Sequence, residues 1–294
     1  MERAELLRRI NTFPLAASTL AADMLSGGFR SVFRGNGIEF EEVRRYEQGD
    51  DIRFIDRNVS ARFGTPYVKL YREERELTVF TVLDCSASMF SGGKGDVNRF
   101  EQALLAAALI GFSAERAGQR FGALFFDNEV RQLFKPGKGR AHLMAVVSAA
   151  LSVRPEGRGS ALSSAIRGAG SLLKRRSLVT LISDFRCPDW EGELRGLAGK
   201  HDFIAVRISD PFDYEFPGFG FLTVEDPESG KTIQAATGFS SFRRAWREWN
   251  EGQSAAWADA CRRLGLARLE LSTTDDAPSV LKFFFQGRRS RVRT

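Results

Sequence analysis

The sequence predicts an α/β fold: a doubly wound, mostly parallel sheet with helices on both faces. From about residue 77 onward, short runs of β-branched or aromatic residues alternate with longer segments of helical periodicity, which is typical of successive βα units. Three of the short runs, 77–83, 178–183 and 203–209, are almost continuously apolar, as expected of parallel strands buried on both faces. The first run ends in an Asp-x-Ser-x-Ser sequence, and polar residues at the carboxyl end of a strand mark the ligand-binding edge of such a sheet.

The predicted elements alternate along the chain, and right-handed crossovers should connect the parallel strands. Asp127, Asn128 and Glu129 predict a hairpin turn into a short strand at 130–134, which gives the sheet one antiparallel edge. A second hairpin, with strands at 221–226 and 231–234, is expected to project from the main sheet as a surface for partner contact. The other strands are expected at 77–83, 121–126, 178–183, 203–209 and 267–271, and the helices near 98–118, 140–151, 160–174, 190–199 and 239–264.

Residues 1–75 differ in texture from the rest of the chain. They begin with a helical pattern, continue through a glycine-bearing segment and end in a charged, extended stretch, without the apolar periodicity of an independent core. We therefore expect an N-terminal extension that packs on an α/β domain of residues 76–287. Residues 288–294 are expected to form a basic tail.

Length and composition predict a folded chain without a membrane segment. The 294 residues are 43% hydrophobic, which suffices for one large domain or for a medium domain with a smaller companion. No run of 18 or more apolar residues is present and the first residues are charged, so neither a membrane span nor a signal peptide is expected. The expected location is the cytoplasm, and the three cysteines are expected to be thiols.

The formal net charge of +6 is concentrated at the carboxyl terminus, where four arginines lie in the last seven residues. We interpret this segment as a solvated tail and expect no nucleic-acid partner. The alternative, nucleic-acid binding through the tail, predicts a steep salt dependence that disappears when residues 288–294 are deleted. With only two histidines in the chain, a histidine-rich zinc site is not expected.

Oxygen-bearing side chains from three loops are expected to meet at one edge of the sheet, because the carboxyl ends of parallel strands converge there. Hydroxyl and carboxylate oxygens suit Mg²⁺, which keeps several waters and leaves a coordination position open. A carboxylate from a partner protein is expected to fill that position. The residues are Asp84, Ser86 and Ser88 after the first predicted strand, Ser160 after a glycine-rich turn that opens a helix, and Asp184 after the strand at 178–183.

Two other interpretations stay open. Asp and Ser are ordinary turn formers after a strand, so the Asp-x-Ser-x-Ser motif alone also has a purely structural interpretation. A strand-terminal Asp with Mg²⁺ also serves phosphoryl transfer, which makes a Mg²⁺-dependent phosphohydrolase the enzyme alternative. Against it, Ser86 stands where haloacid-type phosphatases place a second carboxylate, and no histidine or lysine is evidently paired as acid or base. Hydrolysis of ATP by this chain is not expected, since its glycine-rich segments lack the order of a phosphate-binding loop.

The predicted ligand set resembles the metal-ion-dependent adhesion site (MIDAS) of the von Willebrand factor A fold, whose pattern is Asp-x-Ser-x-Ser, then a Thr, then an Asp. The resemblance implies a non-catalytic protein-binding function that depends on Mg²⁺ or another divalent cation. Ser160 stands where Thr is usual, so the hydroxyl is kept and the methyl group is lost. The implied ligands are Asp84, Ser86, Ser88, Ser160 and Asp184.

The segment Gly35–Arg62 resembles the signature of a bacterial family, domain of unknown function 58 (DUF58), which lies immediately upstream of a von Willebrand-type domain. The matching elements are GxGxEF, RxY, GDDxR and SAR, and the resemblance continues to Gly230, so it spans nearly the whole chain. Arg57 replaces the Trp that usually follows Ile-Asp. The resemblance implies an adaptor that works with a MoxR-type AAA+ ATPase, or with its client, in protein assembly or metal-cofactor insertion.

The charged part of this segment predicts ion pairs. Arginines and aspartates alternate there at a density that no apolar surface could carry, and bidentate Arg–carboxylate pairs would hold the segment in one geometry. We interpret the pairs as a clasp between the extension and the sheet, with direct partner recognition as the alternative. The residues are Arg44, Arg53, Arg62, Asp50, Asp51 and Asp56.

Overall fold

The computed structural model describes residues 3–26, 38–73, 77–92, 97–216, 218, 220–226, 228 and 230–291. The chain forms two compact units. One contains Met1–Arg30 together with Leu77–Thr294, and the other contains Ser31–Glu76. Residues 35–37, which begin the family-like signature, lie outside the described residues.

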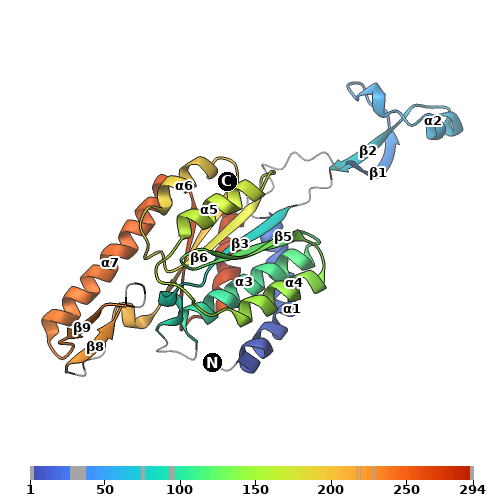
Figure 1. Cartoon of the computed structure of the whole chain (residues 1–294). Coiled ribbons are helices and arrows are strands. Elements are labelled where there is room, and N and C mark those ends of the chain that lie inside the picture. The colour runs from blue at the N-terminus through green and yellow to red at the C-terminus, as the bar shows by residue number, and fades with distance from the viewer. Residues whose placement is uncertain are drawn as a thin grey trace. The chain divides into compact units, whose positions relative to one another are not determined.

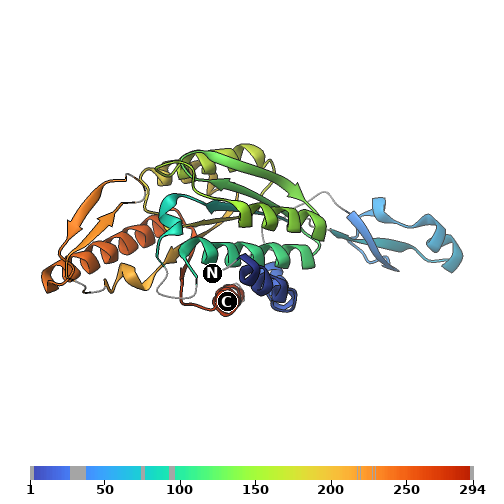
Figure 2. The ribbon, with the colours of Figure 1, turned by 60° about the horizontal axis from the view of Figure 1, so that its bottom comes forward.

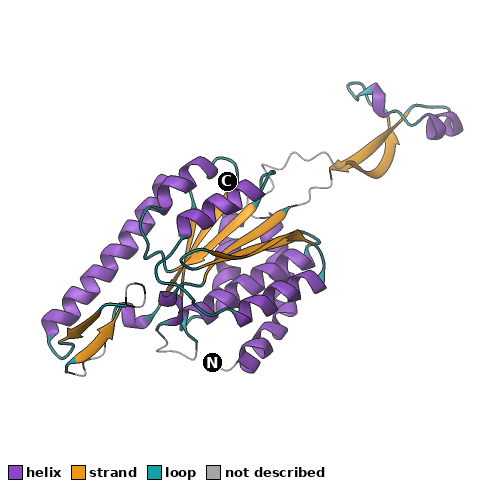
Figure 3. Ribbon diagram, in the orientation of Figure 1, coloured by secondary structure: helices purple, strands orange, loops and turns teal. Residues whose placement is uncertain are grey.

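A six-stranded sheet forms the centre of the first unit (Figures 1 and 3). The strand order is β10-β7-β6-β3-β4-β5, in which β5 runs antiparallel to β4 and all other neighbours are parallel. The structure thus confirms the predicted doubly wound, mostly parallel sheet with one antiparallel edge. The strands are β3 (Thr78–Asp84), β4 (Arg120–Phe126), β5 (Val130–Gly137), β6 (Leu178–Ser183), β7 (Asp202–Ser209) and β10 (Ala267–Ser272).

The winding of the chain reverses at β3. From β3 the chain passes to β4 and β5 on one side, and then returns to β6, β7 and β10 on the other side. In doubly wound sheets, ligands bind outside the carboxyl ends of the strands at such a switch point. The carboxyl ends of β3 and β6 are therefore the place where this fold is built to hold a ligand.

Helices cover both faces of the sheet (Figures 1 and 2). One face carries α1 (Arg3–Ser26), α3 (Arg99–Arg116), α4 (Arg140–Ser152) and α8 (Ala277–Arg291), and the other carries α5 (Leu162–Leu172), α6 (Trp190–Leu197) and α7 (Ser240–Arg263). Short 3-10 helices η3 (Ala87–Phe90) and η4 (Pro211–Asp213) follow β3 and β7, and the hairpin β8 (Leu222–Glu225) and β9 (Thr232–Ala235) precedes α7. The predicted helices and the second hairpin are all present.

Helix α3 is the innermost helix of its layer. It begins with a capping box, in which the Asn98 side chain accepts the Glu101 N–H and the Glu101 carboxylate accepts the Asn98 N–H, each at 2.8 Å. Every residue from Arg99 to Ala114 is buried, because the helix lies between the sheet and helices α1, α4 and α8. A helix enclosed in this way needs apolar residues all around its axis, which explains its alanine- and leucine-rich sequence.

Helix α1 belongs to the α/β unit. Its buried residues recur at a spacing of three or four, and this face packs against α3 and α8. The structure therefore divides the predicted extension of residues 1–75 between the two units. Helix α8 continues to Arg291, so the predicted basic tail of residues 288–294 begins within a helix. The buried residues of α1 include Leu6, Ile10, Phe13, Ala17 and Leu20.

The second unit is a two-stranded antiparallel sheet, β1 (Ile38–Arg45) and β2 (Tyr67–Glu73), connected through η2 (Ile52–Phe54) and α2 (Arg57–Phe63). Helix α2 begins where the Asp56 carboxylate accepts two backbone N–H groups, and it ends at Gly64, whose φ of 66° suits a glycine. Arg57, which stands where the family usually has Trp, is exposed in the first turn of α2.

The charged motif forms ion pairs inside this second unit. Arg44 contacts Asp50 at 2.7 Å and Arg53 contacts Asp51 at 2.6 Å. Hydrogen bonds from the Arg53 side chain and backbone lower the pKa of Asp51 to about 2. Each of these pairs joins two residues of the same unit, so these pairs do not form the predicted clasp to the sheet.

Within the described residues, no helix combines the length and the apolar character needed to cross a bilayer.

The packing of α1 yields a prediction about stability. Leu20 is 1% exposed and lies on the face toward α3 and α8, whereas Leu15 on the same helix is 84% exposed. We expect Leu20→Ala to lower the free energy of unfolding by about 2–4 kcal/mol, because it removes buried methyl groups and leaves a cavity. Leu15→Ala is the matched control, with an expected change within about 0.5 kcal/mol. Urea unfolding measures both, and equal effects would show that α1 does not contribute to the core.

Candidate metal centre

Asp84 lies at the carboxyl end of β3, and both of its carboxylate oxygens are fixed. The residue is 1% exposed. Its Oδ1 accepts a hydrogen bond from the backbone N–H of Ser86 at 2.8 Å, and its Oδ2 accepts one from the hydroxyl of Ser183 at 2.6 Å. Ser183 is the last residue of β6, so this bond joins the ends of the two neighbouring strands.

Ser86 and Ser88 lie in the tight turn that follows β3. Both are buried, and their Oγ atoms are 3.2 Å apart. Backbone hydrogen bonds from Met89 to Ser86 and from Ser91 to Ser88 hold this turn. Two Mg²⁺–oxygen bonds of about 2.0–2.1 Å at right angles place their oxygens about 3 Å apart. The spacing of the two hydroxyls therefore suits neighbouring ligands of one cation.

Asp184 and Ser160 each present a buried oxygen without a hydrogen-bond partner. Asp184 follows β6 directly and is 4% exposed; its Oδ1 accepts the N–H of Arg186 at 3.1 Å, and its Oδ2 has no hydrogen-bond partner among the described residues. Ser160 lies in the loop before α5, and within the same described part of the chain its buried Oγ also has no hydrogen-bond partner by distance and angle. The Cys187 thiol lies near this hydroxyl and interacts with it. Buried oxygens of this kind are rare because they cost free energy.

The loop that carries Ser160 is positioned by Asp127, the first residue after β4. The carbonyl oxygen of Asp127 accepts the N–H of Ala161 at 2.6 Å, and its carboxylate accepts the N–H of Glu156 at 3.3 Å. Arg131 fixes the same carboxylate at 2.7 and 2.8 Å. From the sequence, Asp127 is expected only in a turn. Its position directly after a buried strand also indicates that it could hold a neighbouring loop at this edge of the sheet.

The loops after β3, after β6 and before α5 lie within electrostatic range of one another. Burial, followed by the negative charge of Asp184, raises the pKa of Asp84 to about 7. Burial raises the pKa of the Cys187 thiol to about 12, and this thiol also interacts with Ser160, Asp84 and Asp184. The structure thus brings the predicted oxygen donors of the three loops to one edge of the sheet, and their ligation of a metal stays a prediction.

The set of donors fits a hard divalent cation. Two buried carboxylates close together resist ionising unless a positive charge lies near them. A cation bound there would also give partners to the free oxygens of Ser160 and Asp184. Carboxylate and hydroxyl oxygens are ligands of Mg²⁺, Mn²⁺ and Ca²⁺. In the part of the chain that the structure describes, no three His, Cys, Asp or Glu residues are grouped to hold a metal, so the predicted site depends on the serine hydroxyls as well as on the two carboxylates.

Asp213 of η4 holds two of the site's loops in place. Its Oδ1 accepts hydrogen bonds from Arg99 at 2.5 Å and from Arg186 at 2.6 Å. Arg99 also donates to the Ser91 hydroxyl in the turn after β3, and Arg186 lies two residues after Asp184. The contacts of Asp213 could not be predicted from the sequence, because its partners Arg99 and Arg186 lie 114 and 27 residues away in the chain.

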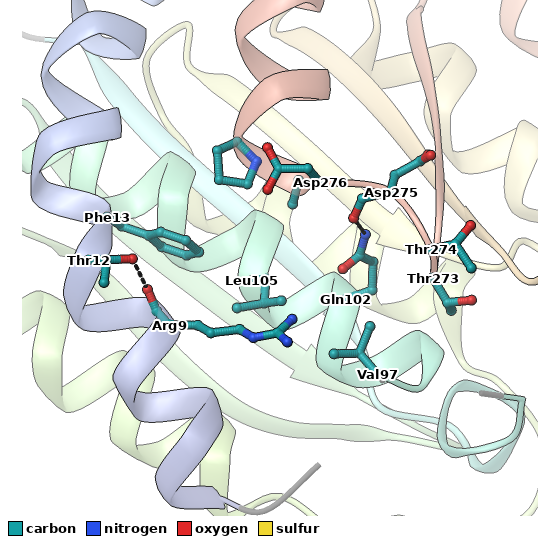
Figure 4. Close-up of a pocket in the computed structure, with 12 residues that line it drawn as sticks. Arg9, Thr12, Phe13, Val97, Gln102, Leu105, Thr273, Thr274, Asp275 and Asp276 are labelled. Atoms are coloured by element: carbon teal, nitrogen blue, oxygen red, sulfur yellow. Dashed lines mark hydrogen bonds between the residues drawn. The ribbon is translucent and has the colours of Figure 1, made fainter. Parts of the chain in front are cut away.

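A separate pocket lies between α1, the start of α3 and the connection from β10 to α8 (Figure 4). The Gln102 side chain there donates to the carbonyl oxygens of Ser272 and Asp275, which fixes that connection. None of the five predicted metal ligands lines this pocket. We therefore assign it a structural role at the packing of α1 and not a part in the metal centre.

Comparison with solved structures found similar chains of low identity. The conserved hypothetical protein BatB from Bacteroides thetaiotaomicron is 13% identical, with a TM-score of 0.48 over 73% of this chain and 99% of that chain. A von Willebrand factor type A protein from Catenulispora acidiphila is 15% identical, with a TM-score of 0.39 over 76% of this chain and 43% of that chain.

Comparison of sequences gives the family directly. An uncharacterized protein of Mycobacterium bovis and one of Mycobacterium tuberculosis are each 32% identical over 295 residues, which cover 98% of this chain and 92% of the relative. The family described as "Protein of unknown function DUF58" matches residues 42–256. The match covers most of the chain, including the candidate ligands and all six residues of the charged motif. The chain belongs to the DUF58 family.

Proposed function

We propose that this protein is a non-catalytic binding module that captures a carboxylate of a partner protein through a bound divalent cation, with Mg²⁺ as the expected metal. The observation that carries the proposal is the buried Oδ2 of Asp184, which has no hydrogen-bond partner among the residues that the structure describes, in a side chain near enough to Asp84 for its charge to act on that carboxylate. The residues that would hold the cation are Asp84, Ser86, Ser88, Ser160 and Asp184.

The charges at the site explain why a partner's carboxylate is the expected ligand. Asp84 and Asp184 together carry two negative charges when both are ionised, and one divalent cation neutralises them. Mg²⁺ has more coordination positions than the five protein ligands fill, and carboxylates are among the oxygen ligands that Mg²⁺ takes. The bound cation would attract the partner's carboxylate. The turn after β3, and the hydrogen bonds from Arg99 and Arg186 to Asp213, would hold the residues that ligate the cation in place.

The fixed geometry of Asp84 argues against the phosphohydrolase alternative. A nucleophilic carboxylate attacks phosphorus through one of its oxygens. The hydrogen bonds that Asp84 accepts from Ser86 and Ser183 lower the nucleophilicity of both oxygens, while each oxygen keeps a lone pair that can bind a cation. Ser86 also occupies the position at which haloacid-type phosphatases have their second carboxylate. These observations favour a binding function over phosphoryl transfer.

The family resemblance adds a candidate for the partner. It implies a MoxR-type AAA+ ATPase or the client of such an ATPase, in protein assembly or metal-cofactor insertion. A carboxylate in a surface-exposed Asp or Glu of that partner is the group that the site would recognise, because a direct bond to the cation would both strengthen the complex and orient it. Binding would then require the divalent cation and would be lost in the presence of a chelator.

The first test of the proposal is stabilisation by Mg²⁺. A ligand that binds only the folded state at 100 times its dissociation constant stabilises it by about 2.7 kcal/mol. We therefore expect Mg²⁺ to raise the melting temperature of the wild type and to leave the melting temperature of Asp84→Asn unchanged. Asp259→Asn, in an exposed pair on α7, is the control and should respond like the wild type. Equal shifts for the wild type and Asp84→Asn would remove the assigned site.

The second test uses pH. The pKa of Asp84 is raised to about 7 by burial and by Asp184, above the value of about 3.9 for an unfolded aspartate. The neutral carboxyl therefore stabilises the metal-free protein below about pH 4, and this contribution is lost as the pH rises to about 7. In chelator, the stability of the wild type should fall relative to that of Asp84→Asn over this range.

Saturating Mg²⁺ should abolish this relative loss, because the cation favours the ionised carboxylate. Urea unfolding at several pH values measures the difference between the two proteins, in which the contributions of titrating groups that do not interact with Asp84 cancel. A difference that does not change between pH 4 and 8 in chelator would contradict the buried carboxylate pair.

A further inference from the structure

A carboxylate of this chain itself reaches the candidate metal centre. Glu228 lies in the connection between β8 and β9, and its Oε1 accepts a hydrogen bond from the backbone N–H of Ser88 at 2.9 Å. The two residues are 140 positions apart, so the contact depends on the fold and not on local sequence. Because Ser88 is one of the predicted ligands, this hydrogen bond seats a negatively charged group on the loop that would hold the cation.

The second oxygen of Glu228 has the same unusual state as two oxygens of the site. Within the described residues its Oε2 is buried and has no hydrogen-bond partner, and the same holds for the Oγ of Ser160 and the Oδ2 of Asp184. These three oxygens come from three separate segments of the chain. A carboxylate that contacts the protein through one oxygen and leaves the other buried and free is under-satisfied unless a cation lies near it.

The connection between β8 and β9 is built to present Glu228. The N–H of Asp226 donates to the carbonyl oxygen of Lys231 at 2.8 Å, and the N–H of Gly230 donates to that of Asp226 at 2.7 Å. The Asp226 side chain accepts the N–H of Glu228 at 3.1 Å. These bonds close the turn and hold the backbone of Glu228 in place.

The same turn also contacts the loop that carries Ser160. The guanidinium of Arg158 packs against Gly230 so closely that a Cβ at this position would lie 2.3 Å from the Arg158 Cζ. Gly230 has a φ of 69°, a conformation that favours glycine. The turn thus contacts the Ser88 loop through Glu228 and the segment before Ser160 through Arg158.

The geometry points to Glu228 as an internal ligand of this centre: its free oxygen takes the coordination position that the partner's carboxylate would use. This inference rests on the proposed function and adds a regulation to it. A partner's carboxylate would have to displace Glu228 from the cation. The hairpin therefore sets how tightly that carboxylate must bind the cation in order to replace Glu228. The described residues contain no group of three acidic side chains already placed to hold a metal, so the Glu228 side chain would have to move toward the cation as it binds.

The experiment compares Glu228→Gln with the wild type, since glutamine keeps an oxygen that can accept the Ser88 N–H and removes only the charge. Glu225→Gln, an exposed glutamate of the same hairpin, is the matched control. The first readout is the affinity for Mn²⁺ alone, measured by electron paramagnetic resonance. We expect Glu228→Gln to bind Mn²⁺ about 10-fold more weakly, and Glu225→Gln to match the wild type.

The second readout is binding of a short peptide with one glutamate at saturating Mn²⁺, with the same peptide carrying glutamine as control. We expect Glu228→Gln to bind the glutamate peptide at least 10-fold more tightly than the wild type does, because the internal competitor is absent.

Equal Mn²⁺ affinity and equal peptide binding in Glu228→Gln and the wild type would overturn this inference. If Asp84→Asn loses Mn²⁺ under the same conditions, the proposed function stands without it. A wild type that binds no Mn²⁺ would overturn both. Equal melting temperatures of Glu228→Gln and the wild type in chelator show that the variant is folded, so that a changed affinity reports on the site.

Discussion

The structure depends on one electrostatic constraint: Asp84 and Asp184 are both buried at the ends of neighbouring parallel strands. Burial raises the cost of ionising Asp84, and the negative charge of Asp184 adds to that cost, which is why the pKa of Asp84 rises to about 7. A hydrophobic pair would be far cheaper at these positions. The two buried carboxylates are explained if a divalent cation binds at this edge of the sheet and neutralises their charge.

The rest of the fold holds this pair and its serines in register. The topology reverses at β3 and so opens the edge of the sheet, Asp127 fixes the loop of Ser160, and Asp213 ties the turn after β3 to the loop after β6 through two arginines. Each is a contact between segments distant in sequence. A set of donors that the protein already holds in place would lose little conformational entropy when a metal binds. Glu228, in the connection between β8 and β9, contacts this set through the hydrogen bond that it accepts from Ser88.

The sequence predicted the features that depend on residues close to one another in the chain. The apolar runs marked β3, β6 and β7 to within a residue or two, since strands buried on both faces must be continuously apolar. Asp84, Ser86, Ser88, Ser160 and Asp184 could be named because loop residues after parallel strands share one edge. The packing of α1 on α3 could not be predicted, because an amphipathic helix does not specify which surface it covers. Asp213 and Glu228 also escaped notice, since their contacts span up to 140 residues. In the second unit the predicted Arg–Asp pairs exist, but their partners are near in sequence and not across to the sheet.

The most direct test is to locate the cation itself. Crystals of the protein grown with Mn²⁺ and measured at the manganese absorption edge would give an anomalous difference peak at the bound metal. The account predicts one peak at the carboxyl ends of β3 and β6, about 2.0–2.3 Å from the Oγ atoms of Ser86 and Ser88, with Asp84 and Asp184 around it. A peak only elsewhere, or an edge of the sheet in which those side chains enclose no metal at saturating Mn²⁺, would contradict it.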